Sequence, residues 1–298
     1  AIWRAKYHSC PVLLGSATPS LESMARAEKG VYQLLVLKER VNGKSLPNVE
    51  IIDMNKEAKN GTSHITNRLL GELSSCIDRG EQAILFLNRR GFSTFVTCKN
   101  CSETIKCPNC DITLTYHKSN RMLRCHYCGY ATPLPKVCPH CKEEALSDLG
   151  VGTEKIEEEL HGLLPNARVL RMDVDTTSRK GAHKKMIDAF RNHEYDILLG
   201  TQIVAKGLDF SDVTLVGVIN ADTSLNIPDF RSSENTYSLL SQVAGRSGRS
   251  QKTGKVYIQT FNPDHYAISF VKEHDYLGFY REEMKIRRRL GYLSLIHI

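Results

Sequence analysis

The chain has 298 residues, 41% of them hydrophobic, which is enough to bury the core of one large domain or of two ordinary ones. Its formal net charge of +7 is a mild bias toward an anionic partner such as nucleic acid, and by itself it is weak evidence. The sequence shows no signal peptide and no apolar run that is long enough to form a transmembrane helix, so we expect a cytoplasmic protein. Because the chain begins at Ala1 rather than at a Met, within a region that is predicted to fold, we expect it to be an internal piece of a longer protein.

The first predicted element is a short apolar strand over residues 12–14, which runs into the turn Gly-Ser-Ala-Thr-Pro-Ser at residues 15–20. A helix is predicted to follow, with Ser20 as its N-cap and Glu22 in its first turn. Residues 41–62 are rich in Asn, Gly, Lys and Pro, a composition that indicates a linker, here with one short strand over residues 49–53.

A second unit begins with a predicted helix over residues 64–79. The continuous apolar run over residues 83–87 is typical of a strand that is buried in a parallel sheet. After a cysteine-rich insertion, the alternation resumes with helices at residues 153–164, 179–192 and 233–244 and strands at residues 168–172, 196–200, 213–219 and 255–260. This alternation predicts an α/β fold with a parallel sheet, helices on both faces and ligands at the carboxyl ends of the strands. Residues 265–290 are predicted to be helical.

Eight of the ten cysteines form four Cys-x-x-Cys pairs: Cys98/Cys101, Cys107/Cys110, Cys125/Cys128 and Cys138/Cys141. A Cys-x-x-Cys turn places two thiolates on one side of the backbone, where they can share a tetrahedral ion. Four such turns supply the ligands of two closed zinc sites.

Other uses of these cysteines remain open as alternatives. A disulfide framework requires an oxidising compartment, a thioredoxin-like redox site uses one pair, and a catalytic zinc keeps an open position and usually has a His or carboxylate ligand. We therefore favour two structural Zn²⁺ ions. The isolated residues Cys10 and Cys76 are expected to be small buried apolar groups.

The spacing of the pairs favours a nested arrangement among the three possible pairings. Fourteen residues lie between Cys110 and Cys125, close to the interval of a zinc ribbon, whereas only five lie between Cys101 and Cys107. The inner site is then Cys107, Cys110, Cys125 and Cys128, and the outer site, which closes the base of the lobe, is Cys98, Cys101, Cys138 and Cys141. Gly129 follows one pair, at a position where a positive φ costs a glycine little.

Three short motifs outside the insertion can contact a nucleotide or a nucleic acid. The first is Ser16-Ala17-Thr18, which by itself fits a helix-capping turn equally well. In the second, Gly200-Thr201-Gln202 ends a predicted strand and can offer backbone amides and a hydroxyl to a phosphate oxygen. Downstream of that strand, Lys206 supplies a point charge and Asp209 can orient a ribose hydroxyl, and a plain turn with surface charges is the alternative.

The third motif is Gln242-Val243-Ala244-Gly245-Arg246-Ser247-Gly248-Arg249, at the end of a predicted helix. The glycines let the backbone approach a ligand, and Arg246 and Arg249 can converge on one polyanion. Arginines of this kind stabilise the charge on a transferred phosphoryl group. A flexible basic loop is the alternative, and the presence of the other motifs in order argues against it.

In this order, the three motifs resemble the later motifs of superfamily 2 helicases. With four Cys-x-x-Cys pairs inserted after the first strand of the second lobe, the chain is similar to the PriA family of bacterial replication-restart DNA helicases, also called primosomal protein N′. The resemblance covers residues 1–292 and extends to residues 86–91, 152–155, 172–177, 220–222 and 228–231.

The resemblance implies a RecA-like second helicase lobe (residues 63–96 and 149–264) with a zinc-binding insertion (residues 97–148). Residues 1–40 are the end of the first RecA-like lobe, residues 41–62 a linker, and residues 265–298 the helical start of a C-terminal region. The implied activity is that of an ATP-dependent 3′-to-5′ DNA helicase that binds branched and single-stranded DNA at stalled forks. Its implied partners are primosome and single-strand-binding proteins, and ATP and Mg²⁺ are shared with the first lobe.

The resemblance also implies roles for individual residues. Ser16 and Thr18 couple hydrolysis to movement on DNA, while Thr201, Gln202 and Lys206 contact DNA or transmit the nucleotide state. The catalytic residues that face ATP are Gln242, Arg246 and Arg249, and the other residues on the nucleotide side are Gly207, Asp209 and Gly245.

The chain departs from the family pattern in several places. The phosphate-binding Gly-x-x-x-x-Gly-Lys-[Ser/Thr] loop and the Asp-Glu-x-His box are absent and are expected upstream of Ala1, so the isolated chain is not expected to hydrolyse ATP. Leu208 stands where the family often has His, Asn235 stands where a basic residue is common, and residues 293–298 do not resemble the family. Two alternatives remain. One is a non-enzymatic zinc-bearing adapter for DNA or proteins. The other is a different superfamily 2 translocase, a hypothesis that does not explain the cysteine pairs.

Overall fold

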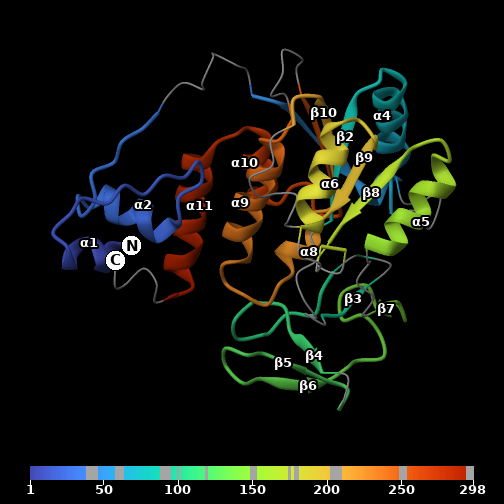
Figure 1. Ribbon diagram of the computed structural model, residues 1–298. Helices are drawn as coiled ribbons and strands as arrows, with labels where there is room; N and C mark the ends of the chain where they lie inside the picture. Colours follow the sequence, from blue (N-terminus) through green and yellow to red (C-terminus); the bar gives the residue numbers. More distant parts are fainter. Residues whose placement is uncertain are drawn as a thin grey trace.

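A six-stranded parallel sheet forms the centre of the computed structural model, in the order β1-β11-β10-β2-β9-β8 (Figure 1). The structure describes residues 1–37, 46–57, 64–87, 95–98, 101, 103–117, 120–147, 153–173, 176–177, 181–201, 210–247 and 254–292. The six strands are β1 (Asn48–Asp53), β2 (Gln82–Leu87), β8 (Val169–Met172), β9 (Ile197–Gly200), β10 (Val213–Asn220) and β11 (Lys255–Thr260).

Strand β2 explains why the sheet is covered on both faces. All six of its residues are buried, and successive side chains of a strand point to opposite faces. Ile84 and Phe86 enter one hydrophobic core, whereas Ala83, Leu85 and Leu87 enter the other. The predicted parallel sheet with helices on both faces is confirmed.

Two groups of helices supply these cores (Figure 1). One face is covered by α4 (Asn67–Asp78) and α5 (Thr153–Leu163). The other is covered by α6 (Ala182–Arg191), α9 (Ser232–Ala244), α10 (Tyr266–Lys272) and α11 (Tyr276–Arg289). Two short helices, α3 (Met54–Glu57) and α8 (Asp222–Leu225), follow strands β1 and β10. Together with the sheet, residues 46–87 and 153–292 form what we call the sheet lobe.

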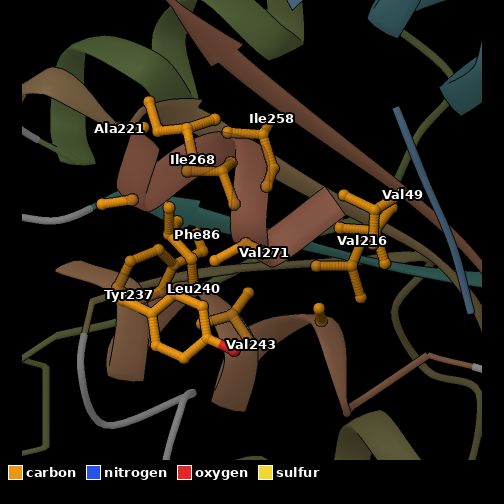
Figure 2. Close-up of a cluster of buried hydrophobic side chains, with 14 of the residues drawn as sticks. Val49, Phe86, Val216, Ala221, Tyr237, Leu240, Val243, Ile258, Ile268 and Val271 are labelled. Carbon is orange, nitrogen blue, oxygen red and sulfur yellow. The ribbon is translucent and has the colours of Figure 1, made fainter. Parts of the chain in front are cut away.

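Figure 2 shows the core under α9 and α10. Side chains of both helices pack against side chains of the strands, and each of them is almost completely removed from water. Burial of this kind is the main source of stability for helices of such length. The labelled residues of this core are Val49, Phe86, Val216, Ala221, Tyr237, Leu240, Val243, Ile258, Ile268 and Val271.

The insertion forms a separate small lobe, residues 95–147, which we call the cysteine lobe (Figure 1). It leaves the sheet after the carboxyl end of β2 and returns at the start of α5. At its base β3 (Thr97–Cys98) pairs with β7 (Leu146–Ser147), and beyond it β4 (Thr115–His117), β5 (Met122–Arg124) and β6 (Ala131–Pro133) form an antiparallel sheet. Its own small core is built around Leu114 and Leu123.

The N-terminal segment, residues 1–37, holds α1 (Ile2–Tyr7) and α2 (Leu21–Glu28). The predicted helix with Ser20 as its N-cap is confirmed, since the Ser20 hydroxyl accepts the amide of Ser23 at 3.3 Å. The predicted strand over residues 12–14 is wrong: no strand in the described part of the chain pairs with it, and Leu13 is 85% exposed. A strand exists only through its neighbours, because its backbone groups need partners.

Three smaller differences from the sequence-based expectations concern residue placement. Residues 265–290 form two helices, because His274 adopts φ 55° and Asp275 caps α11 by accepting the amide of Gly278. The strand expected within the linker is β1, and it pairs with β11 at the edge of the main sheet. Cys76 is buried as expected, but Cys10 is exposed.

A helix that spans a membrane must be both long and apolar. Across the described ranges, no helix combines the length and the apolar character that crossing a bilayer demands.

Candidate metal centre and motor motifs

The eight paired cysteines gather into two clusters of four thiols. In each cluster the four Sγ atoms all lie within 4.8 Å of one another. One cluster is Cys98, Cys101, Cys138 and Cys141, and the other is Cys107, Cys110, Cys125 and Cys128. The structure thus brings together the same cysteines as the nested arrangement that the spacing favours.

The distances between sulfur atoms fit a zinc ion. Sγ of Cys98 lies 3.6 Å from Sγ of Cys141, and Sγ of Cys107 lies 3.5 Å from Sγ of Cys128. A tetrahedral zinc ion with Zn–S bonds of about 2.3 Å separates its sulfur ligands by about 3.8 Å. A disulfide would require about 2.05 Å. The two clusters support two zinc ions, and four thiolates fill the coordination of each, as in structural sites.

The local backbone explains how each pair is held open for an ion. In all four pairs the amide of the first cysteine donates to the carbonyl of the residue five positions later. This bond folds the turn back on itself, so that both thiols project to the same side. The donor and acceptor pairs are Cys98 with Glu103 (2.9 Å) and Cys107 with Ile112, Cys125 with Tyr130 and Cys138 with Glu143 (each 2.8 Å).

The residue after the second cysteine carries the conformational cost of the turn. Asp111, Gly129 and Lys142 occupy this position and have φ values of 53°, 77° and 66°. Each donates its amide to the carbonyl of the first cysteine of its pair. Only glycine adopts such a φ without a steric penalty, so Gly129 adopts the positive φ that the sequence predicts at little cost. Asp111 and Lys142 adopt a positive φ with steric strain.

The thiols differ in how readily they ionise. Burial, with a smaller contribution from neighbouring thiols, raises the pKa of Cys101 and of Cys110 to about 12. The amide of Tyr130, followed by the side-chain amide of Asn109, lowers the pKa of the exposed Cys128 to about 6. Zinc binds thiolates, so binding at either site releases protons and weakens as the pH falls.

The structure brings the first and third of the three short motifs together. The hydroxyl oxygens of Thr18 and Ser238 lie 2.9 Å apart, and Nε2 of Gln242 donates to the same Ser238 hydroxyl at 3.1 Å. Ser16 lies beside them, since its hydroxyl accepts the amide of Thr18 at 3.1 Å. Ser238 was not singled out from the sequence, where it is one of several serines on α9.

The turn after α9 lies at the opposite edge of the sheet from Thr201. Ser247 donates its hydroxyl to the carbonyl of Thr214 at 2.9 Å, which places Gly245 and the half-buried Arg246 beside the amino end of β10. Thr201 follows the carboxyl end of β9 and is buried. A crossover helix runs antiparallel to its strands, so its end returns to the amino edge. Thr201 therefore lies at the carboxyl edge of the sheet, where the sequence predicts ligands, whereas Gly245 and Arg246 lie at the amino edge. Gly245 has a helical φ of −63° and needs no glycine for its conformation.

Five of the predicted site residues belong to segments that the structure does not describe. They are Gln202, Lys206, Gly207, Asp209 and Arg249.

The N-terminal segment docks on the sheet lobe through α2. The amide of Leu21 donates to Oε1 of Glu234 at 3.0 Å, and Arg231 pairs with Glu22 at 2.7 Å. Nearby, the Tyr276 hydroxyl donates to the carbonyl of Pro19 at 2.8 Å. These contacts hold Thr18 against α9.

A further contact joins the two lobes and was missed from the sequence. The Tyr127 hydroxyl donates to Oδ1 of Asp229 at 3.3 Å, and its ring meets the edge of Phe230 with centroids 6.2 Å apart. Phe230 stacks on Tyr292 at 5.0 Å, and the Tyr292 hydroxyl donates to the carbonyl of Cys110 at 3.1 Å. In the sequence, this contact was indicated only by the position of Tyr127, an aromatic residue between Cys125 and Cys128.

Two family models match the chain. The PriA DNA helicase Cys-rich region matches residues 107–133, and the helicase conserved C-terminal domain matches residues 148–251. The first falls on the inner cysteine cluster, and the second spans much of the sheet lobe.

The chain is also similar to curated and solved proteins. It is 57% identical to the replication restart protein PriA of Bacillus subtilis over 98% of this chain and 36% of that protein. It is 46% identical to the replication restart protein PriA of a Synechocystis species over 97% of this chain and 36% of that protein. The chain therefore spans about a third of the length of these relatives.

Among solved structures, RecG bound to a three-way DNA junction matches 91% of this chain and 26% of its own, with a TM-score of 0.50. At 16% identity this likeness concerns the fold alone. With two family models matched, and with this identity to replication restart proteins across nearly all of its residues, the chain belongs to the PriA replication restart helicase family.

Proposed function

We propose that this chain is the second motor lobe and the zinc lobe of an ATP-dependent 3′-to-5′ DNA helicase of the bacterial cytoplasm. The helicase binds branched and single-stranded DNA at stalled replication forks and loads the primosome, with single-strand-binding protein among its partners. The observation that carries this proposal is the 57% identity to the Bacillus subtilis replication restart protein over 98% of the chain. Because the chain spans 36% of that relative, the activity, substrate and partners of the whole protein are part of the proposal.

In this proposal the turn after α9 acts on ATP. Arg246 and Arg249 stabilise the charge that develops on the transferred phosphoryl group, while Mg²⁺-ATP is held jointly with the first lobe. The hydrogen-bonded line from Gln242 through Ser238 to Thr18 supports a coupling role for the first motif, because it joins a nucleotide-side residue to the N-terminal segment. Thr201 contacts DNA from the other edge of the sheet.

The cysteine lobe has a different role in the proposal. Each four-thiolate site is closed, so the lobe supplies structure for strand capture or partner docking and takes no part in hydrolysis. Cys107→Ser in the full-length protein should therefore impair unwinding or partner loading while DNA-stimulated ATP turnover continues. Loss of ATP turnover with normal fork binding and normal partner loading would contradict this role.

The motor assignment is tested with the full-length protein and two substitutions, Arg246→Ala and Arg249→Ala. Each is expected to abolish DNA-stimulated ATP hydrolysis while leaving the affinity for a model fork largely unchanged. The matched control is Arg191→Ala, which removes an exposed arginine of α6 whose ion pair, within the described ranges, is with Asp188 of its own helix. Normal turnover in both test variants would remove the phosphoryl-stabilising role, and a full-length protein without ATPase activity would favour the zinc-bearing adapter.

A further inference from the structure

The two lobes meet through three aromatic residues, Tyr127, Phe230 and Tyr292, which we call the aromatic bridge. Two of its residues are joined to the inner cluster of the cysteine lobe. Tyr127 lies between Cys125 and Cys128, and Tyr292 donates to the carbonyl of Cys110, which belongs to the partner turn of the same cluster. The bridge therefore touches both halves of one metal site.

Phe230 is the centre of the bridge, is only partly exposed and has neighbours on its faces and its edge. The guanidinium groups of Arg231 and Arg287 lie 5.0 and 5.1 Å from its ring centroid, Tyr292 stacks on it, and Tyr127 meets its edge. A platform for stacking nucleobases keeps an aromatic face open to the ligand. Phe230 is instead a packed junction between the two lobes.

The same two arginines continue the contact to the N-terminal segment. Arg287 is 1% exposed and donates to Oε1 of Glu283 at 2.8 Å and to Oε2 of Glu234 at 2.7 Å. The other carboxylate oxygen of Glu234 accepts the amide of Leu21, at the start of α2. Arg231 pairs with Glu22 one residue later.

The buried ion pairs of Arg287 link the positions of the residues that form them. A buried guanidinium is tolerated only while its carboxylate partners stay in place, so Arg287, Glu283 and Glu234 have to move together. Glu234 thus ties the position of Arg287, and of the Phe230 ring against it, to the first turn of α2.

We propose that the aromatic bridge couples occupancy of the inner zinc site to the docking of α2, and with it to the position of Thr18. Zinc fixes the two inner turns, and they set the positions of Tyr127 and of the carbonyl that holds Tyr292. These in turn position Phe230 and the arginines that bind α2. Tyr127 and Phe230 are positioning residues. The coupling requires neither ATP nor DNA, and so it stands apart from the proposed function.

The outer site provides an internal control. Its cysteines lie at the base of the lobe, where β3 pairs with β7, and Sγ of Cys98 and of Cys101 lie 3.6 and 3.7 Å from Sγ of Cys141 and of Cys138. Loss of the outer zinc is therefore expected to leave α2 undisturbed.

The first test compares amide hydrogen exchange of residues 21–28 in the zinc-loaded chain, in Cys107→Ser and in Cys138→Ser, each checked for its zinc content. Loss of the inner site is expected to speed exchange in α2 about five-fold or more, and loss of the outer site is expected to leave it unchanged. Equal effects of the two variants, or no effect of either, would overturn the proposal.

A second test keeps zinc bound and reads the coupling in reverse. Phe230→Leu retains an apolar side chain but removes the ring on which the arginines and Tyr292 lie. Linkage is reciprocal, so this variant should speed zinc release in a chain that retains only the inner site. Release from a chain that retains only the outer site should not change. If Phe230→Leu loosens α2 while inner-site release stays at the wild-type rate, the bridge does not transmit zinc occupancy and the proposal fails.

Discussion

One hydroxyl, that of Ser238, links Thr18 to Gln242 although 220 residues separate Thr18 from Ser238. The contact is partly buried, which makes it stronger than an equivalent bond in open water. It places the first motif of the N-terminal segment directly on the helix that leads into the Gly245 turn. A substitution at Thr18 is therefore expected to alter the hydrogen bonding of Gln242, and a substitution at Gln242 that of Thr18.

The first prediction concerns this hydroxyl pair. Thr18→Val keeps the shape of the side chain and removes its hydroxyl, so the free energy of local opening of residues 16–28 should fall by about 0.5–1.5 kcal/mol. Hydrogen exchange measures this opening, and Ser75→Ala, on the far face of the sheet, is the control. Combining Thr18→Val with Ser238→Ala should cost less than the sum of the two single changes. Strict additivity would mean that the two hydroxyls do not interact in solution.

The second prediction concerns zinc removal. Metal binding is folding free energy for a small lobe of this kind, and the core around Leu114 and Leu123 is small. Strong chelation should therefore expose the amides of residues 103–147 first, while β2 and β10 remain protected. Hydrogen exchange followed by mass spectrometry resolves the two regions. Simultaneous unfolding of both lobes would show that the cysteine lobe is not an independent unit.

Zinc content gives an independent check of the pairing. The wild-type chain should hold two zinc ions, and Cys98→Ser and Cys107→Ser should each hold one, because the two substitutions fall in different clusters. Loss of both ions from either single variant would indicate that the sites do not form separately.

The third prediction concerns the backbone of the cysteine turns. Lys142 adopts φ 66°, so Lys142→Gly should stabilise the cysteine lobe by about 0.5–1 kcal/mol. Gly129→Ala should destabilise it by about 1 kcal/mol for the reverse reason, since a Cβ at that position meets no other atom within 4 Å. Rates of zinc release to a chelator compare the variants.

A matched control separates strain relief from the general effect of glycine. Lys136 is exposed and does not have a positive φ, so Lys136→Gly should weaken the lobe slightly. If Lys142→Gly behaves in the same way as Lys136→Gly, the positive φ at residue 142 is not a source of strain.

The sheet was predictable where the sequence pattern is local. The continuous apolar run of β2 indicates a buried strand, and the spacing of apolar residues in α4 indicates a helix with one buried face. Both elements could therefore be identified from sequence. Residues 12–14 have the same apolar character, but they form no strand, because strand formation depends on a neighbour that no local pattern specifies. The break at His274 was also missed, since it arises from a backbone angle rather than from composition.

The metal site was more predictable than the contacts around it. Five residues between Cys101 and Cys107 are too few for those two turns to face each other, which favours the nested pairing from spacing alone. Tyr127, Phe230 and Tyr292 lie 62 or more residues apart and share no repeating pattern, so their contact becomes visible only in three dimensions. The same holds for Thr18 and Ser238.

The fourth prediction concerns Gly217, in the middle of β10. A Cβ at this position would lie 2.6 Å from Cδ2 of Leu85 and 3.0 Å from Cδ1 of Leu69, and both leucines are completely buried. Neither side chain can turn into solvent, so Gly217→Ala should lower the free energy of unfolding by about 1–3 kcal/mol. Gly71→Ala, on the exposed face of α4 where a Cβ meets nothing within 4 Å, should raise it by about 0.5–1 kcal/mol. Urea unfolding compares them, and equal effects would show that the close packing of α4 on β10 is not needed.

The fifth prediction concerns the pH dependence of α10, whose N-cap is His265. Nδ1 of His265 accepts the amide of Ala267 at 3.2 Å, so the neutral ring carries its proton on Nε2. Burial, and to a smaller extent the charge of Lys106, lowers the pKa of His265 to about 4. In the unfolded chain a histidine titrates near about 6.5. Between these two values the unfolded chain binds a proton that the folded chain does not, so the contribution of His265 to stability is complete above about pH 6.5 and is lost as the pH falls toward about 4.

His265→Asn isolates this effect, because an asparagine oxygen can cap the helix and does not titrate. From about pH 7 to about pH 5, the free energy of unfolding in urea should fall more steeply for the wild-type chain than for the variant. Zinc release in acid affects both proteins equally and cancels in the comparison. Parallel pH profiles would mean that the folded chain protonates His265 as easily as the unfolded chain does, and that the buried ring is not held neutral.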